Sequence, residues 1–208
     1  NSSNYFIEYD GSDLFNFTPG KAFWVTSKDP MSYAADVKSV NVDNNSCFSI
    51  PLHSGWNIIS NPFEKQVSWS KIVQLNSITL NPLIYSWDNK WINSNTTMSP
   101  YVGYYFYNAH ELDSLKIQYN PTGNINSVLE KKAVNNLEIT LNSETEELAK
   151  VFVGINDSAK VDFDEFDYYA APIFVEKTNL RLFNDNLTSS YKYLLSDIRP
   201  MQNDGVVY

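Results

Sequence analysis

The sequence predicts an all-β fold made of two β-sandwich-like modules, the first with an internal β repeat and the second immunoglobulin-like. Aromatic residues make up 15% of the 208 residues, which favours strands over helices. Short stretches alternate between apolar and polar residues, and clusters of Asn, Gly and Pro separate them. Hydrophobic residues make up 43% of the chain, which is enough to form buried cores.

The clearest strand pattern lies in residues 48–63, FSIPLHSGWNIISNPF. Within it, residues 48–52 alternate between apolar and less apolar side chains, as a half-buried strand does. Gly55 tolerates a positive φ and therefore predicts a tight turn. The apolar run resumes at residues 56–59, so we expect a hairpin at the centre of the first module.

The first module is assigned to residues 1–121. Its other strands are predicted at residues 5–9, 22–26, 37–42, 83–87, 103–107 and 115–119, with a hairpin loop at 88–90. Residues 22–26 are apolar on both faces, which predicts a central strand. Trp69, Ile72 and Val73 recur at helical spacing, and Ser68 can cap the first turn. We therefore expect one short helix within residues 67–75.

An internal repeat is predicted in the first module. Pro19 and Pro100 each precede an aromatic stretch by four residues, at 23–25 and 104–106, with a glycine in between. The two copies lie 81 residues apart and flank the central hairpin. Two copies are too few for a solenoid, so the pattern favours a pseudo-symmetric sandwich or barrel.

The second module is assigned to residues 125–208. Strand patterns occur at residues 137–141, 151–155, 180–183, 191–195 and 206–208. Short strands separated by regular turn residues are typical of an immunoglobulin-like sandwich. The Pro, Gly and Asn cluster at 120–124 predicts the boundary between the modules. Since the chain starts at Asn1 and ends within a strand pattern, we expect an excerpt of a longer polypeptide, or a processed piece of one, with a truncated second module.

Charge and cysteine content exclude several classes of partner. The net charge is −9, which disfavours nucleic acid and anionic membrane surfaces because both require a basic face. The single cysteine, Cys47, allows no internal disulfide, and we expect it to be buried. No apolar run approaches the roughly 18 residues of a membrane span, so membrane insertion is not expected.

Three motifs of the first module carry a resemblance to a known class of protein: PGKAFW at 19–24, GWNIISNPF at 55–63 and GYYFYN at 103–108. They resemble β-rich modules of large secreted and cell-surface proteins of Bacteroidota-type bacteria, which are associated with type IX secretion. Residues 163–172 and 191–199 are similar to the segment that often follows such modules. The resemblance implies an extracellular or cell-surface location, with neighbouring domains or protein chains as partners. The sorting domain of those proteins is not part of this sequence.

The one candidate metal site lies in an acidic loop at residues 157–167. Asp162, Asp164 and Asp167 supply carboxylate oxygens, which are the ligands that Ca²⁺ prefers. Their spacing lacks the glycine and the distal glutamate of an EF-hand loop. Two interpretations therefore stay open, a solvated loop and a calcium site. No other cofactor is expected.

Aromatic side chains offer a second candidate site. Trp87 and Trp91 flank the loop at 88–90, and Tyr101 follows Pro100 in a turn-like context. The apolar faces of sugar rings stack on such side chains, so glycans are candidate ligands. The alternative is that these residues belong to cores and cross-strand pairs, as most Trp and Tyr residues of β proteins do.

No catalytic constellation is recognisable. His53 and His110 are the two histidines and lie far apart in the sequence, and no nucleophile-elbow, phosphate-loop or dinucleotide motif occurs. We therefore expect no enzyme but a non-catalytic structural, spacer or adhesion segment of an extracellular multidomain protein or filament, with residues 5–7 and 206–208 as contact strands. The alternative is a carbohydrate-binding module of an exported enzyme.

Overall fold

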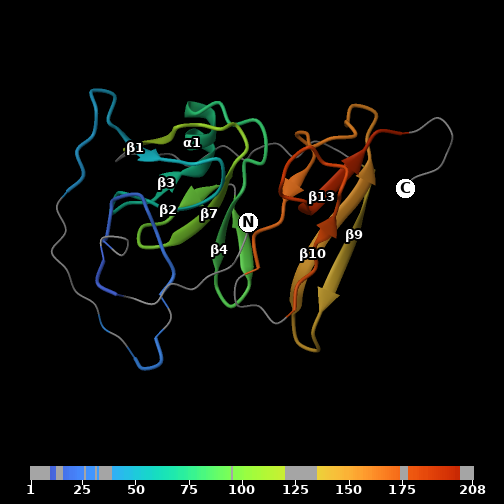
Figure 1. Ribbon diagram of the computed structural model, residues 1–208, viewed down its shortest axis with the longest axis horizontal. Coiled ribbons are helices and arrows are strands. Elements are labelled where there is room, and N and C mark those ends of the chain that lie inside the picture. The colour runs from blue at the N-terminus through green and yellow to red at the C-terminus, as the bar shows by residue number, and fades with distance from the viewer. Residues whose placement is uncertain are drawn as a thin grey trace.

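The computed structural model describes residues 10–12, 16–25, 27–30, 32, 39–94, 96–119, 135–173 and 178–201. In these residues the fold is all-β and of sandwich type with one short helix, which confirms the predicted all-β, sandwich-type class. Two groups of strands lie side by side (Figure 1). We call residues 47–118 the first module and residues 135–199 the second module.

Several sequence predictions lie outside the described residues. They are the strands at 5–9 and 206–208, residues 37 and 38 of the strand at 37–42, and the module boundary at 120–124. Residues 39–42 are described and form no strand, so the strand prediction is wrong for them. The assigned ranges 1–121 and 125–208 therefore stay predictions.

The described residues of the first module form nine elements. They are β1 (Cys47–Pro51), β2 (Gly55–Ser60), β3 (Val67–Ser68), α1 (Trp69–Leu75), β4 (Ile84–Trp87), β5 (Trp91–Ser94), β6 (Thr97–Met98), β7 (Gly103–Asn108) and β8 (Ser114–Gln118). The largest sheet is antiparallel, with strand order β2-β7-β4-β5, while β1 pairs with β8 and β3 with β6. The predicted hairpin around residues 88–90 is confirmed, since β4 and β5 pair directly.

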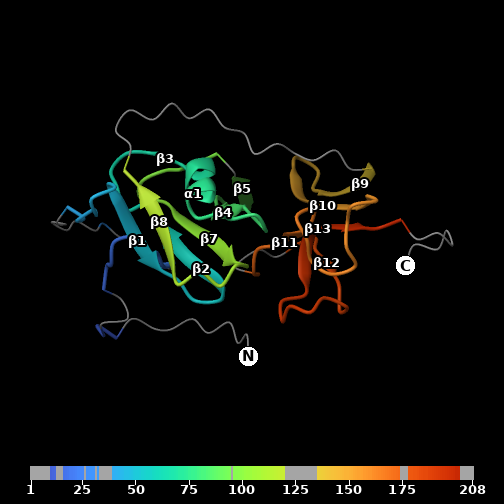
Figure 2. The ribbon, with the colours of Figure 1, turned by 90° about the horizontal axis from the view of Figure 1, so that it is seen from above.

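The predicted central hairpin is wrong, although both of its strands exist. β1 pairs with β8 and β2 pairs with β7, so the two strands belong to different sheets (Figure 2). Ile50 of β1 and Ile59 of β2 are both buried in one core. Residues 52–54 therefore cross from one sheet to the other, because each strand turns its apolar face toward the same interior. Gly55 has the predicted positive φ, at 79°.

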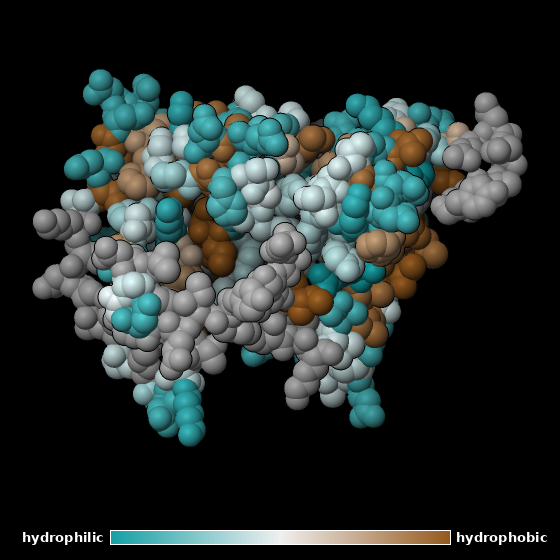
Figure 3. Space-filling view, in the orientation of Figure 1, coloured by the Kyte–Doolittle hydropathy of each residue, from teal (hydrophilic) through white to brown (hydrophobic). Residues whose placement is uncertain are grey.

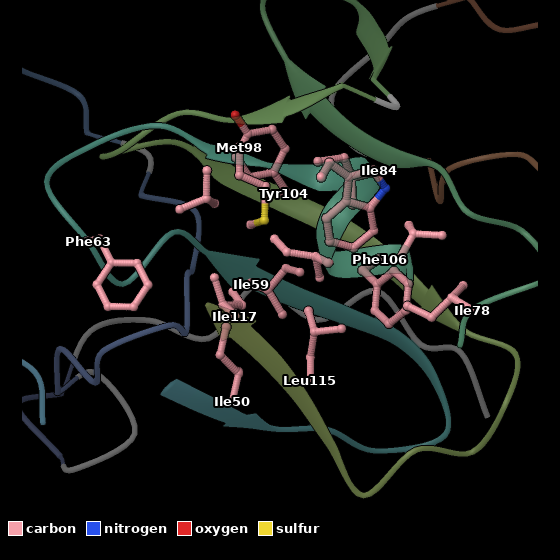
Figure 4. Close-up of a cluster of buried hydrophobic side chains, with 14 residues drawn as sticks. Ile50, Ile59, Phe63, Ile78, Ile84, Met98, Tyr104, Phe106, Leu115 and Ile117 are labelled. Carbon is pink, nitrogen blue, oxygen red and sulfur yellow. The ribbon is translucent and has the colours of Figure 1, made fainter. Parts of the chain in front are cut away.

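The core of the first module lies between these sheets and α1. Figure 4 shows its side chains pointing toward one another. Trp69 is fully buried, its ring lies 5.6 Å from that of Phe106, and its Nε1 donates to the carbonyl of Pro82 at 2.6 Å. The Oγ of Ser68 accepts the N–H of Lys71 at 3.3 Å, so the predicted helix and its cap are confirmed.

Residues 20–25 do not form the predicted central strand. The N–H of Ser60 donates to the carbonyl of Gly20 at 2.8 Å, and Lys21 forms an isolated bridge with Ile59. Beyond this contact, Phe23 and Val25 are 37% and 57% exposed, because the segment leaves the edge of β2. β7 occupies the other edge of β2, so both segments of the predicted repeat lie beside the same strand, and only the later one is itself a strand.

The second module is built around one mixed sheet. Its strands are β9 (Asn135–Asn142), β10 (Glu147–Ile155), β11 (Tyr168–Tyr169), β12 (Leu182–Phe183) and β13 (Tyr193–Arg199). The order is β11-β13-β10-β9, with β12 also pairing with β13. β9 and β10 form an antiparallel hairpin, whereas β10 and β13 run parallel. The strands predicted at 137–141 and 151–155 are confirmed, and residues 156–192 form the long connection that a parallel pair requires.

Candidate functional site

Aromatic side chains line one face of the sheet β2-β7-β4-β5, which we call the aromatic face. Strand register places these side chains on the same side of the sheet, because directly opposed residues of antiparallel strands share a face. They are Trp56, Tyr85, Trp87, Trp91, Tyr105 and Tyr107. The other face of the same sheet, including Ile59 and Phe106, belongs to the buried core.

The structure brings together two of the three predicted glycan-binding residues. Trp87 and Trp91 are directly opposed on β4 and β5, with ring centroids 5.2 Å apart. Tyr101 lies in the turn before β7 with a φ of 61° and is 89% exposed. Among the described residues, Tyr101 makes no ring contact with either tryptophan.

The geometry of the tryptophan pair limits what it can bind. The rings of Trp87 and Trp91 are inclined by 75°, so they share no plane on which a sugar could lie. Trp91 also meets Tyr105 edge to face at 5.2 Å and packs against a buried cluster that includes Ala171 of the chain's second half. Both tryptophans are partly buried. Packing within the sheet therefore accounts for most of their contacts.

Two buried hydrogen bonds between the modules reach a single residue of β11. The hydroxyl of Tyr85 donates to the carbonyl oxygen of Tyr169 at 2.5 Å, and the N–H of Tyr169 donates to Oδ1 of Asn81 at 3.0 Å. All three residues are buried. Burial raises the pKa of the Tyr85 hydroxyl far above its ordinary value, so it remains a protonated donor at any physiological pH. Side chains of the first module thus satisfy both main-chain groups of Tyr169.

Trp56 is the centre of the aromatic contacts between the modules. Its ring meets four tyrosine rings edge to face, at centroid distances between 5.2 and 6.1 Å. Three of them belong to the first module and the fourth, Tyr191, belongs to the second. Tyr107 extends the contact, with its ring 4.1 Å from that of Tyr169, and Phe163 stacks on Tyr169 at 4.1 Å. Such aromatic pairs contribute roughly 0.5–1.5 kcal/mol each beyond the area they bury.

Sequence reasoning assigned no role to Asn81, Tyr85 or Tyr169. Their hydrogen bonds join residues 84 and 88 positions apart, and no motif marks such partners in a single sequence. The interface also has a polar rim, where Nζ of Lys90 lies 2.9 Å from a carboxylate oxygen of Glu146. Both of these side chains are about half exposed, so this ion pair adds little to stability.

The acidic loop at residues 157–167 is only partly exposed to solvent. Asp164 and Asp167 are 5% and 0% exposed, so the interpretation as a solvated loop is wrong for both residues. Oδ1 of Asp167 accepts the N–H of Ile198 at 2.8 Å, and its Oδ2 accepts the N–H of Asp164 at 3.1 Å. Asp167 therefore ties the loop to β13, because its carboxylate supplies acceptors that the irregular backbone lacks.

The other two carboxylates of the loop are also engaged by the protein. Asp164 accepts the N–H groups of Lys160 at 2.6 Å and Phe166 at 2.8 Å. Asp162 accepts the hydroxyl of Thr188 at 2.6 Å, and this bond is the largest of the causes that lower its pKa. Within the described ranges, no group of three or more His, Cys, Asp or Glu side chains is arranged to hold a metal ion. The calcium site stays a prediction.

The stability of the protein is expected to depend on the protonation of Asp167. Burial is the largest cause that raises its pKa, to about 7, above the unfolded value of 3.8. Between these two values the folded state binds a proton that the unfolded state releases, so the free energy of unfolding falls as the pH rises from 4 to 7. The expected loss is on the order of 3 kcal/mol.

Urea denaturation of the wild type and of Asp167→Asn across this pH range measures the effect. The difference between their free energies of unfolding should shrink as the pH rises, because asparagine does not titrate. A difference that is constant with pH would show that Asp167 is already ionised in the folded protein at pH 4.

The two histidines have structural partners. Nε2 of His110 accepts the N–H groups of Thr79 at 3.0 Å and Leu80 at 3.1 Å. Nδ1 of His53 lies 2.9 Å from the carbonyl oxygen of Ser54. Each ring therefore organises a loop, and the two belong to different ends of the first module's sequence.

Comparison with known proteins identifies no relative. No family model matches the chain, and no curated protein and no solved structure shows significant similarity to it. In the part of the chain that the structure describes, no helix has the length and apolar character needed to cross a membrane.

Proposed function

We propose that this chain is a non-catalytic structural segment, a spacer or adhesion unit of an extracellular multidomain protein or filament. The observation that carries the proposal is the buried interface between the two modules. Tyr85 and Asn81 hold the main chain of Tyr169, and Trp56 lies amid rings from both modules. The extracellular or cell-surface location rests on the resemblance of the sequence motifs.

An interface of this kind suits a segment that holds other parts of a protein at a fixed separation. Neighbouring domains move relative to one another unless their interface is large and hydrophobic. Here the aromatic face of the first module is itself the contact surface, and Leu194 and Leu187 of the second module are buried in the same cluster as Tyr107. The modules are thereby expected to keep one relative orientation.

The alternative function is a carbohydrate-binding module. Its supporting observation is the juxtaposition of Trp87 and Trp91 on one face of a hairpin. The inclination of their rings and the packing of Trp91 against Tyr105 favour the spacer instead.

A glycan array probed with the full chain separates the two functions. The spacer proposal predicts no saturable glycan binding. Trp91→Ala and Phe183→Ala form a matched pair, because Phe183 is a 63% exposed aromatic residue of the second module, away from the tryptophan pair. Saturable binding that is lost in Trp91→Ala and kept in Phe183→Ala would replace the spacer by a carbohydrate-binding module.

A further inference from the structure

Among the described residues, β9 is the outermost strand of the second module's sheet, and its outer edge is long. It spans eight residues, and β10 is its one neighbour in the sheet. In the described ranges no main-chain hydrogen bond reaches the outer edge of β9. The outer edge of β2 differs, because residues 20–22 donate to it and accept from it. Unpaired strand edges are templates for pairing with another strand.

The sequence of β9 lacks the features that usually protect such an edge. It reads NNLEITLN, with no proline, no lysine and Glu138 as its single charge. Leu137 and Ile139 are 62% and 40% exposed and project from the same face. Hydrophobic surface gathers over the second module on the side of β9 and β10 (Figure 3). A long apolar edge without protecting charges or prolines is an association site.

We propose that β9 pairs antiparallel with β9 of a second copy of this chain, around a two-fold axis at Ile139. The inference names the partner of the assembly unit proposed above and rests on that proposed function. Two-fold pairing of identical strands continues the sheet across the copies and satisfies the free main-chain groups of both edges.

Register and charge select this pairing among the alternatives. Opposed residues share a face, so apolar side chains meet only in registers that oppose odd-numbered with odd-numbered residues. Two such registers pair seven residues of the strand. One places Glu138 against the partner's Glu138, and like charges directly opposite each other are destabilising. The other places Ile139 against the partner's Ile139 and Glu138 against the partner's Thr140, so it has no charge conflict.

The same register completes an apolar stripe across the contact. Leu137 meets the partner's Leu141, and by symmetry Leu141 meets the partner's Leu137. Val151 and Val153 of β10 flank the stripe in each copy, since they are opposed to Ile139 and Leu137 within the chain. Glu138 keeps its own ion pair, with Nζ of Lys150 at 2.9 Å on the opposite face.

Cysteine cross-linking of the full chain tests the register directly. Directly opposed residues have Cβ atoms about 4.5–5.5 Å apart, close enough for a disulfide after small adjustments. Under mild oxidation, Ile139→Cys should cross-link with itself, whereas Leu137→Cys should not. A mixture of Leu137→Cys and Leu141→Cys chains should cross-link. The wild type is the control, because its own Cys47 is 6% exposed.

Sedimentation equilibrium measures the association without a cross-link. The wild type should double its mass with increasing concentration, and Ile139→Lys should raise the dissociation constant at least tenfold while the dilute protein still unfolds in one cooperative transition. If the wild type is monomeric up to millimolar concentration and Ile139→Cys does not cross-link, the pairing is wrong. This result would not affect the spacer function. Trp91-dependent glycan binding would overturn the spacer function without affecting the pairing.

Discussion

Replacement of Gly20 by alanine is expected to destabilise the first module by about 2–5 kcal/mol. Gly20 has a φ of 80°, which side chains other than glycine rarely adopt. An added Cβ would also lie 2.5 Å from Cγ1 of Ile50, a fully buried residue of the core. Strain and overpacking therefore act together, and chemical denaturation measures their sum.

Gly55→Ala is the matched control for this substitution. Gly55 has nearly the same φ, at 79°, but an added Cβ would meet no atom within 4 Å. Gly55→Ala should lower the free energy of unfolding only by the backbone strain, about 1–3 kcal/mol. If both substitutions reduce the free energy of unfolding equally, the close approach of Gly20 to Ile50 is not present in solution.

Trp56→Ala should have the second large effect, a loss of about 3–5 kcal/mol. The substitution removes contacts with four tyrosine rings and opens the interface between the modules. Calorimetry should show one cooperative transition in the wild type and separate transitions for the two modules in the variant, because the shared cluster no longer couples them.

Trp87→Ala provides the comparison for Trp56→Ala. Trp87 lies on the same face, but its contact with Trp91 is within the first module. This variant should lower the stability of that module and keep a single transition. Separate transitions already in the wild type would contradict the coupling of the modules.

Local sequence patterns predicted local structure well. The helix at 69–75 followed from the spacing of Trp69, Ile72 and Val73, and the strands at 48–52 and 137–141 followed from alternation. The pairing of strands did not follow, because it depends on which faces share a core. β1 and β2 have the pattern of a hairpin, yet Ile50 and Ile59 contribute to one core from two sheets. Residues 22–26 were misassigned because an apolar run also fits a segment that packs across a sheet edge.

The candidate sites were predicted less well, because they too depend on which parts of the chain pack together. Trp87 and Trp91 are neighbours across a short hairpin, so their proximity was predicted correctly from the sequence. The bond between Tyr85 and Tyr169 depends on the docking of two modules and has no local signal. The acidic residues looked solvated because several carboxylates repel one another, but backbone N–H groups stabilise Asp164 and Asp167 in a buried position.

A distance measurement between the two modules tests most directly whether the aromatic interface fixes them in one orientation. Spin labels at Lys71→Cys on α1 and Glu144→Cys in the β9–β10 turn report this distance, since both positions are exposed and Cys47 is buried. Dilution with unlabelled chain removes distances between copies. If the interface fixes the orientation, the wild type shows one narrow distance distribution, and the distribution broadens in Trp56→Ala. A broad distribution in the wild type would contradict a fixed orientation.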